Sequence, residues 1–326
     1  MKNRQKILGI DIGGTSVKFA LMDVLGNIEK KWTIPTDISE RGAKIPGDIC
    51  TSVRRVLGDQ QIKEVSGIGI GVPGPISPDG HTVVRAVNLD WEEVPLKKII
   101  QQELGVDTCL LNDANAAALG EMWQGAAKGK SNLLFVTLGT GVGGGIVLNG
   151  EVLNGCHSAG GEIGHIPVRS EEDRLCGCGG RNCLETFASA TGLSYSMKKK
   201  LKECNERWPQ VTPPLIFAKA AEGHSAAQQV LEEFVDILGQ AIAGILNTID
   251  VEEVVIGGGL SEAGADLIDP LTAKINQYAF PQIRGQISVK KAELGNDAGI
   301  YGAVYAHSFI KNLQEGECDG LIVKNV

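Results

Sequence analysis

The chain has 326 residues, 43% hydrophobic and 21% charged, so it is long enough for two domains and apolar enough to bury a core. Its 31 basic and 39 acidic side chains give a net charge of −8. That charge excludes a general nucleic-acid binder, because binding to phosphates needs a basic surface. No apolar run approaches the roughly 20 residues of a membrane span, and residues 1–9 hold no signal-peptide stretch, so we expect a cytoplasmic protein without a membrane partner.

The first part of the chain predicts an α/β unit that opens with three short strands and a glycine turn between the first two. Buried strands read as apolar runs, and helices read as apolar positions at a spacing of three to four residues. The elements expected here are strands within 6–34, a helix at 45–57, a strand at 66–72, a helix at 96–104, a strand at 108–111 and a helix at 112–127.

The same opening of strand, glycine turn and strand returns from residue 133. Further elements are expected as helices at 184–204 and 225–248, a strand at 252–258, a helix ending near 278, a strand at 287–292 and a helix at 298–310. This repetition indicates an internal duplication and two α/β domains with a cleft between them. We place the domains at 1–115 and 116–299, with residues 300–326 forming a C-terminal helix that packs back on the first domain, and a tail.

Glycine is unusually frequent: 43 of the 326 residues, about 13%, are glycine, against a usual share of ~7%. The run at 139–144 matches the dinucleotide fingerprint G-x-G-x-x-G, but a strand follows it where that motif requires a helix. The run at 125–131 is one residue short of a P-loop and lies between a helix and a strand, in the reverse of the required order. Both nucleotide motifs are therefore rejected.

What remains is a set of glycine turns whose backbone N–H groups can bind phosphate oxygens. The turns lie at residues 11–15, 138–141 and 257–259. The hydroxyls of Thr15 and Thr140 add side-chain donors, and Asp11 can hold Mg²⁺ directly or through water. One such turn is ordinary turn chemistry, but three at strand ends indicate a nucleotide site.

Two further patterns carry chemistry. His165, Cys176, Cys178 and Cys183 have the spacing H-x₁₀-C-x-C-x₄-C, which predicts a closed, structural zinc site; the alternative is a set of free thiols. Asp113 follows Asn112 at a strand-to-helix junction, where a carboxylate either acts as a general base or simply caps the helix.

Three segments resemble the signatures of the ROK family (repressors, open reading frames, sugar kinases): LNDAN at 111–115, GEIGH at 161–165 and CGCGGRNCLE at 176–185. The resemblance extends in motif order from about residue 7 to residue 310. It implies the two-domain fold of sugar kinases, actin and heat-shock ATPases, which is ribonuclease H-like, with an interdomain cleft.

The resemblance also implies roles for individual residues. Asp113 is expected to be the general base. The residues expected to bind the sugar are Asn88, Asn112, Asp113, Glu162, His165 and Glu185. Those expected to bind ATP and its Mg²⁺ are Asp11, Gly13, Gly14, Thr15, Lys18, Thr140, Gly141, Gly257 and Gly258. Structural Zn²⁺ is expected on His165, Cys176, Cys178 and Cys183.

The expected activity is therefore ATP-dependent phosphorylation of glucose to glucose 6-phosphate, by a homodimer or higher homo-oligomer. Kinases for N-acetylmannosamine, fructose or another hexose remain alternatives, because they differ only in pocket contacts. A sugar-responsive ROK repressor is less well supported, since only residues 1–6 precede the first strand and the net charge is −8. An actin-like or chaperone ATPase is disfavoured by the cysteine cluster and the E-x-G-H segment.

Overall fold

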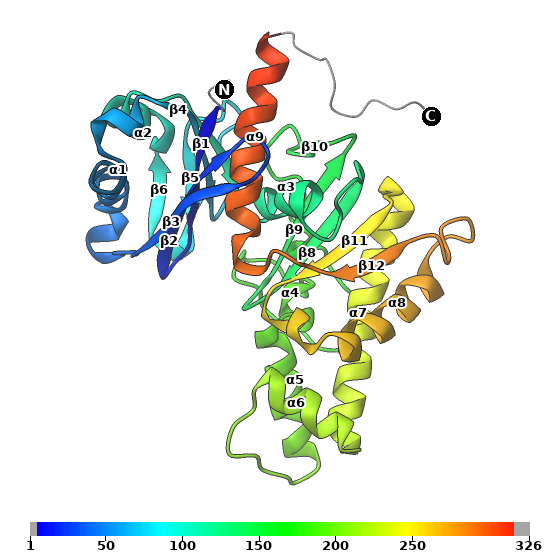
Figure 1. Cartoon of the computed structure of the whole chain (residues 1–326). Helices are drawn as coiled ribbons and strands as arrows, with labels where there is room; N and C mark the ends of the chain where they lie inside the picture. Colours follow the sequence, from blue (N-terminus) through cyan, green and yellow to red (C-terminus); the bar gives the residue numbers. More distant parts are fainter. Residues whose placement is uncertain (1–4, 316–326) are drawn as a thin grey trace. The chain divides into compact units, whose positions relative to one another are not determined.

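A computed structural model of the chain describes residues 5–315, and within that range the chain forms two compact units (Figure 1). The first unit takes in residues 5–125, 154–159 and 296–315, and the second takes in residues 126–153 and 160–295. The boundary predicted after residue 115 falls inside a helix, and that whole helix belongs to the first unit. The units are described separately below.

The first unit is built on a five-stranded sheet with the order β3-β2-β1-β4-β7. Its first three strands are antiparallel neighbours, and β4 and β7 then add in parallel. A parallel strand inside a sheet is covered on both faces, which explains the continuous apolar and glycine run of β4. The strands are β1 (Lys6–Ile12), β2 (Ser16–Asp23), β3 (Ile28–Pro35), β4 (Val65–Val72) and β7 (Thr108–Asn112).

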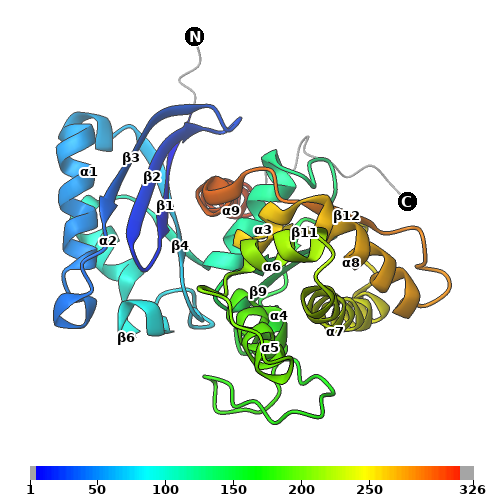
Figure 2. The same cartoon turned by 90° about the horizontal axis from the view of Figure 1, so that it is seen from below.

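Helices cover both faces of this sheet (Figure 2). On one face, α1 (Ile45–Ile62) and α2 (Leu96–Leu104) pack on Leu8 and Ile10; on the other, α9 (Ala298–Glu315) packs on Ile7. Alternate residues of β1 thus face opposite cores, as a pleated strand requires.

Glycines let α9 lie directly on the sheet. A Cβ atom at Gly69 of β4 would lie 1.9 Å from the carbonyl oxygen of Ala303. A Cβ atom at Gly302 would lie 1.6 Å from the carbonyl oxygen of Ala116 in α3 (Asp113–Gln124). Because no larger residue fits either contact, these glycines fix where the two helices meet the sheet and each other.

The second unit repeats the topology of the first, with the sheet order β10-β9-β8-β11-β12. Its first three strands are again antiparallel and the last two parallel, so the predicted return of the strand–turn–strand opening is confirmed. The strands are β8 (Leu133–Leu138), β9 (Val142–Leu148), β10 (Glu151–Val152), β11 (Glu253–Gly257) and β12 (Ser288–Lys291).

The helices of the second unit include the 25-residue α7, whose apolar stripe is buried against the sheet. They are α4 (Glu185–Ala188), α5 (Ala190–Glu203), α6 (Pro213–Ala221), α7 (Ser225–Ile249) and α8 (Ala265–Tyr278). Short 3₁₀ helices are η1 (Ser39–Gly42) and η2 (Val87–Leu89) in the first unit, η3 (Ile163–His165) and η4 (Gly259–Ala263) in the second, and η5 (Gly295–Asp297) at residues 295–297.

Three local features differ from the sequence prediction or are missing from it. The helix expected over 184–204 breaks at Ser189, which is extended and caps α5 by accepting a hydrogen bond from the Gly192 N–H. Helix α6 was not predicted at all. The segment around Asn88, for which no regular structure was predicted, lies in η2 between two short paired strands, β5 (Val83–Ala86) and β6 (Trp91–Val94).

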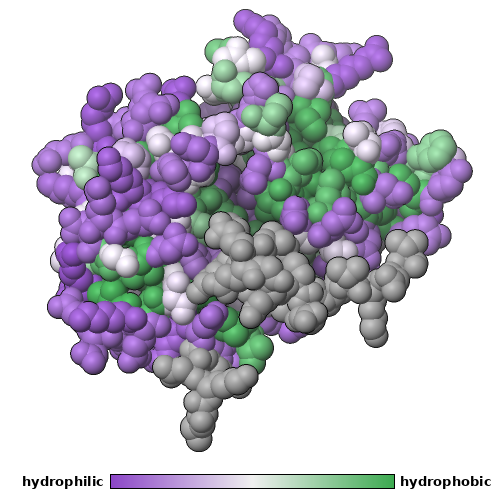
Figure 3. All heavy atoms as spheres, turned by 90° about the horizontal axis from the view of Figure 1, so that it is seen from above, coloured by the Kyte–Doolittle hydropathy of each residue, from purple (hydrophilic) through white to green (hydrophobic). Residues whose placement is uncertain are grey.

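The described residues also bear on the expectation about membranes. Among them, no helix combines the length and apolar character needed to cross a bilayer. Hydrophilic residues make up most of the face drawn in Figure 3, and hydrophobic ones show in patches between them. The tail beyond residue 312, for which the sequence predicts nothing, lies outside the described residues from residue 316 onward.

Candidate active site

The first glycine turn connects β1 to β2 and is closed by backbone hydrogen bonds. The Gly13 N–H donates to the Ser16 carbonyl at 3.0 Å, and the Thr36 hydroxyl donates to the Gly13 carbonyl at 2.7 Å. Thr15 is exposed at the tip. The turn is therefore fixed at its base and open at its tip, as a phosphate-binding turn must be.

Asp11 lies at the end of β1, opposite Lys18 of β2. The two side chains form an ion pair of 3.3 Å, and the Lys18 ammonium also donates to the carbonyl of Asn296 at 3.0 Å. Burial raises the pKa of the Asp11 carboxyl above its ordinary value, while Lys18 acts in the opposite direction. A largely buried carboxylate with one cation beside it suits a hard divalent ion such as Mg²⁺.

The first turn of α9 also lies beside Asp11, which sequence reasoning missed. An ideal Cβ atom at Gly299 would lie 3.0 Å from Oδ1 of Asp11, so the first turn of α9 meets this carboxylate. The only available signal was the polar and small run from Asn296 to Gly299, which is also typical of an ordinary helix start.

Asn112 and Asp113 have different structural roles. Asn112 is the N-cap of α3: its side-chain oxygen accepts from the Ala114 and Asn115 N–H groups, and its amide donates to the Gly74 carbonyl at 3.2 Å. Asp113 is the first helical residue and is exposed, with Oδ1 accepting from the Ala114 N–H at 2.8 Å. The N-cap position of α3 is thus occupied by Asn112, and Asp113 adds one further hydrogen bond to a first-turn amide.

Asn88 lies near the first glycine turn. A Cβ atom at Gly14 would be 3.5 Å from the Cβ atom of Asn88, and the Asn88 side chain is exposed. The first unit therefore brings the predicted sugar contact Asn88 beside the predicted phosphate turn.

In the second unit, the remaining glycine turns are neighbours because β8 and β11 pair in parallel and both turns follow the carboxyl ends of these strands. A Cβ atom at Gly258, whose φ is +79°, would lie 2.5 Å from the Leu138 carbonyl oxygen. The Gly139 N–H donates to the Gly141 carbonyl, and Thr140 is exposed at the tip. The structure thus places the predicted residues Gly257, Gly258, Thr140 and Gly141 at one sheet edge.

The four predicted metal ligands also lie together. One donor atom from each of His165, Cys176, Cys178 and Cys183 lies within 4.8 Å of every other. The Cys178 and Cys183 sulfurs are 3.6 Å apart, and Cys176 Sγ is 3.7 Å from His165 Nδ1. A tetrahedral zinc ion with Zn–S bonds of 2.3 Å separates its sulfurs by about 3.8 Å, so the donor set fits zinc.

Two carboxylates flank this cluster. Glu162, which precedes η3, has Oε2 3.9 Å from His165 Nε2. Glu185, the first residue of α4, lies on the other side of the ring, with Oε1 4.0 Å from Nδ1, and it accepts a hydrogen bond of 2.9 Å from Cys176. The second unit therefore brings together all three sugar contacts predicted for residues 162–185.

Glu185 also touches the second glycine turn. A Cβ atom at Gly141 would lie 2.6 Å from Oε2 of Glu185. The predicted sugar contact and the predicted phosphate turn are thus in direct contact within this unit.

Comparison with known proteins shows which family the chain belongs to. A sequence model of the ROK family matches residues 7–308. A glucokinase from Halalkalibacterium halodurans is 40% identical, covering 90% of this chain and 92% of its own. A xylose repressor from Caldicellulosiruptor bescii is 31% identical, covering 93% of this chain and 78% of its own. The solved structure of a ROK family glucokinase from Streptomyces griseus in complex with glucose and AMPPNP superposes with a TM-score of 0.74 at 30% identity, covering 92% of this chain and 98% of that one.

Proposed function

The chain belongs to the ROK family, and on that premise we propose that it is a glucokinase, which transfers a phosphoryl group from ATP to glucose and forms glucose 6-phosphate. The observation that carries the proposal is the likeness to a glucokinase along nearly the whole of both chains. Each unit, taken by itself, supports it, because each holds a glycine turn suited to phosphates together with polar side chains suited to a sugar.

Asp113 is the residue we propose as the general base. A sugar hydroxyl does not lose its proton at neutral pH, so phosphoryl transfer needs a carboxylate within hydrogen-bonding distance of it. The Asp113 carboxylate is exposed, so a sugar hydroxyl can reach it, while Asn112 occupies the N-cap position of α3. It takes the proton of the attacking hydroxyl while the oxygen forms its bond to phosphorus and the bond to ADP breaks.

The glycine turns are proposed to bind ATP, with Thr15 and Thr140 adding hydroxyl donors and Lys18 balancing phosphate charge. Asp11 would hold the Mg²⁺ that accompanies the nucleotide, and bound Mg²⁺ neutralises charge developing on the phosphates. The third turn, Gly257–Gly258, is proposed to lie on the nucleotide side as well.

The sugar is proposed to bind through Asn88, Asn112, Glu162, His165 and Glu185. Carboxylates and amides are suited to hydroxyl groups, because they accept or donate hydrogen bonds with fixed geometry. In the cluster, His165 Nδ1 faces Cys176 and Nε2 faces Glu162. If Nδ1 binds zinc, the opposite nitrogen presents an N–H toward the sugar side, and the metal holds the ring in place.

The test is a coupled assay of a hexose panel with ATP and Mg²⁺. Glucose should give the highest kcat/KM. A tenfold advantage for N-acetylmannosamine or fructose, which corresponds to ~1.4 kcal/mol in transition-state binding, would move the assignment to that sugar.

A sugar-binding repressor is the second candidate, because a xylose repressor is also similar to this chain. Tight xylose binding without phosphorylation of any hexose would favour it. We further infer a cytoplasmic homodimer or higher homo-oligomer, which light scattering of the purified protein would test.

A further inference from the structure

Arg174 is the most heavily engaged charged side chain near the cysteine cluster, although nothing above assigns it a role. Arginine is rarely buried, yet only 9% of this side chain is exposed. Its guanidinium donates to Glu172 Oε2 at 2.7 Å, to the Thr186 carbonyl at 2.7 Å and to Ser196 Oγ at 2.9 Å.

Two aromatic rings complete its surroundings. The guanidinium carbon lies 4.1 Å from the ring centre of Phe187 and 4.6 Å from that of Tyr195. The planar guanidinium of arginine can donate hydrogen bonds in three directions while it stacks on aromatic rings. The ammonium group of lysine cannot reproduce this combination.

The backbone of Arg174 is fixed separately, within the ribbon that carries the cysteines. Its N–H donates to the Asn182 side chain at 2.7 Å, and the Asn182 N–H donates to its carbonyl at 2.8 Å. A β-bridge between Leu175 and Arg181 continues this ribbon. Arg174 therefore belongs to the ribbon through its backbone and to α4 and α5 through its side chain.

Helix α4 needs such an outside contact. It has only four residues, too few to be stable as a helix by itself, so its position depends on tertiary contacts. Thr186 makes two hydrogen bonds to the Cys183 carbonyl, on the metal side of the helix start. The hydrogen bond from Arg174 to the Thr186 carbonyl is charge-assisted, and it connects α4 to the ribbon without involving a predicted metal ligand.

We propose that Arg174 is a positioning residue for the sugar site: it holds α4, and with it the Glu185 carboxylate, in place independently of the cysteine cluster. This proposal rests on the proposed sugar-binding role of Glu185. The proposal also explains why this charge is buried against Thr186, the residue that follows Glu185 in α4, and why it is surrounded by matched partners.

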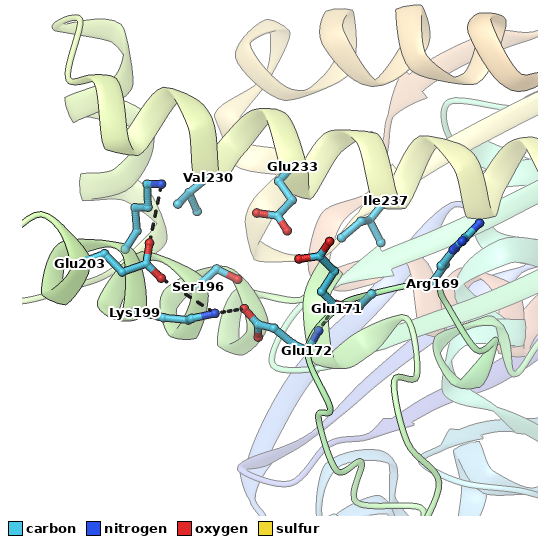
Figure 4. Close-up of a pocket in the computed structure, with 11 residues that line it drawn as sticks. Arg169, Glu171, Glu172, Ser196, Lys199, Glu203, Val230, Glu233 and Ile237 are labelled. Carbon is cyan, nitrogen blue, oxygen red and sulfur yellow. Dashed lines mark hydrogen bonds and ion pairs between the residues drawn. The ribbon is translucent and has the colours of Figure 1, made fainter.

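Two of the groups that bind Arg174 also border a solvent-accessible cavity. Glu172 and Ser196, two of the groups that bind Arg174, line a cavity of about 700 Å³ between α5, α7 and residues 169–172 (Figure 4). Lys199, which also lines the cavity, donates to Glu172 Oε1 at 2.7 Å. Glu172 thus bridges Arg174 to a surface lysine, which keeps its carboxylate oriented toward the guanidinium.

The main test is Arg174→Lys, which keeps the charge but loses the planar fork and the stacking. We expect the KM for glucose to rise ten- to a hundredfold, while the KM for ATP and the zinc content per chain stay unchanged. Hydrogen exchange of the amides in residues 184–190 should become faster, because α4 has lost its tie.

Arg181→Lys is the matched control. Arg181 lies on the same ribbon and its side chain is 61% exposed, paired with Asp173, so this change should leave both KM values and the exchange rates as they are. Ser196→Ala removes one partner of Arg174 without touching its charge, and it should shift the glucose KM in the same direction by a smaller factor.

The outcomes separate the two proposals. If the unaltered protein phosphorylates no hexose, the proposed function fails, and faster exchange at 184–190 in Arg174→Lys still supports the tie to α4. If the unaltered protein is an active kinase and both Arg174→Lys and Ser196→Ala keep its glucose KM, the positioning role is overturned. An equal rise in the KM for glucose and for ATP would also overturn it.

Discussion

The absence of a side chain at Gly141 leaves room for the carboxylate of Glu185, because a Cβ atom there would lie 2.6 Å from Oε2. The proposed phosphate-binding turn is therefore in contact with a proposed sugar-binding side chain. A substitution in this turn is expected to affect glucose binding only if the new side chain points toward Glu185.

Gly141→Ala should weaken binding of both substrates. The new methyl group displaces Glu185, so the KM for glucose should rise along with that for ATP, by about tenfold or more. Gly139→Ala is the control, because a Cβ atom at Gly139 meets nothing within 4 Å and should leave the glucose KM unchanged. Steady-state kinetics with each substrate varied in turn would measure this, and an unchanged glucose KM in Gly141→Ala would contradict the prediction.

Asp113→Asn should lower turnover by ~10² to 10⁴-fold, the range for loss of a positioned general base. Stability should hold, because Asn112 rather than Asp113 caps α3. The companion variant Asn112→Ala should lower the free energy of unfolding by about 1 kcal/mol, the usual cost of a lost cap, and it should also raise the KM for glucose, because Asn112 is a proposed sugar contact. Thermal unfolding and turnover measured on both variants would separate the roles. A folded Asp113→Asn enzyme with normal turnover would exclude Asp113 as the base.

Cys178→Ser should remove about one zinc ion per chain, measured by elemental analysis, as expected for a single site with four ligands. Glucose affinity should fall steeply, because the glycine-rich segment around the cluster then loses its order and binding must restore it. ATP binding should change little. Cys204→Ser, at an exposed cysteine outside the cluster, should keep both zinc and affinity. Unchanged glucose affinity in zinc-free Cys178→Ser would show that the cluster does not organise the sugar site.

Acidification should destabilise the region around Glu172. Burial favours the protonated form, but the hydrogen bonds from Arg174 and Lys199 outweigh it and lower the pKa of Glu172 below its ordinary value of 4.5. A carboxyl whose pKa is lower in the folded state contributes stability above that ordinary value, and this contribution is lost as the pH falls through the lowered pKa. Glu172→Gln should therefore show a smaller loss of stability with acid than the unaltered protein in thermal unfolding across this range. Equal slopes would refute the ion-pair contribution.

The sequence predicted the two sheets well, because their strands carry strong local signals. The apolar run of alternating glycine and isoleucine indicates strand β4, and the glycine turns mark where β1 and β8 end. Both signals are local and need no tertiary information. Helix α6 and the break at Ser189 were missed, since both depend on packing and on a capping hydrogen bond that spacing does not show.

The site was predictable to the extent that motifs are local. The four predicted metal ligands are confined to 19 residues, and they do lie together. Arg174 could not be found in this way, because it binds the backbone carbonyl of Thr186 and the hydroxyl of Ser196, and no sequence motif marks such partners. Only the structure shows that Asn112, and not Asp113, occupies the N-cap position of α3, since both residue types are favoured at a helix start.

The placement of α9 has a consequence for the order in which the chain folds during synthesis. Ile300 and Val304 of α9 close a core with Ile7 and Met22, which leave the ribosome almost three hundred residues earlier. The second unit, by contrast, draws only on residues 126–153 and 160–295. Since domains fold as they emerge, the second unit can be complete while the first still has one face of its sheet uncovered. Newly made chains are thus exposed to aggregation through that face until α9 is released.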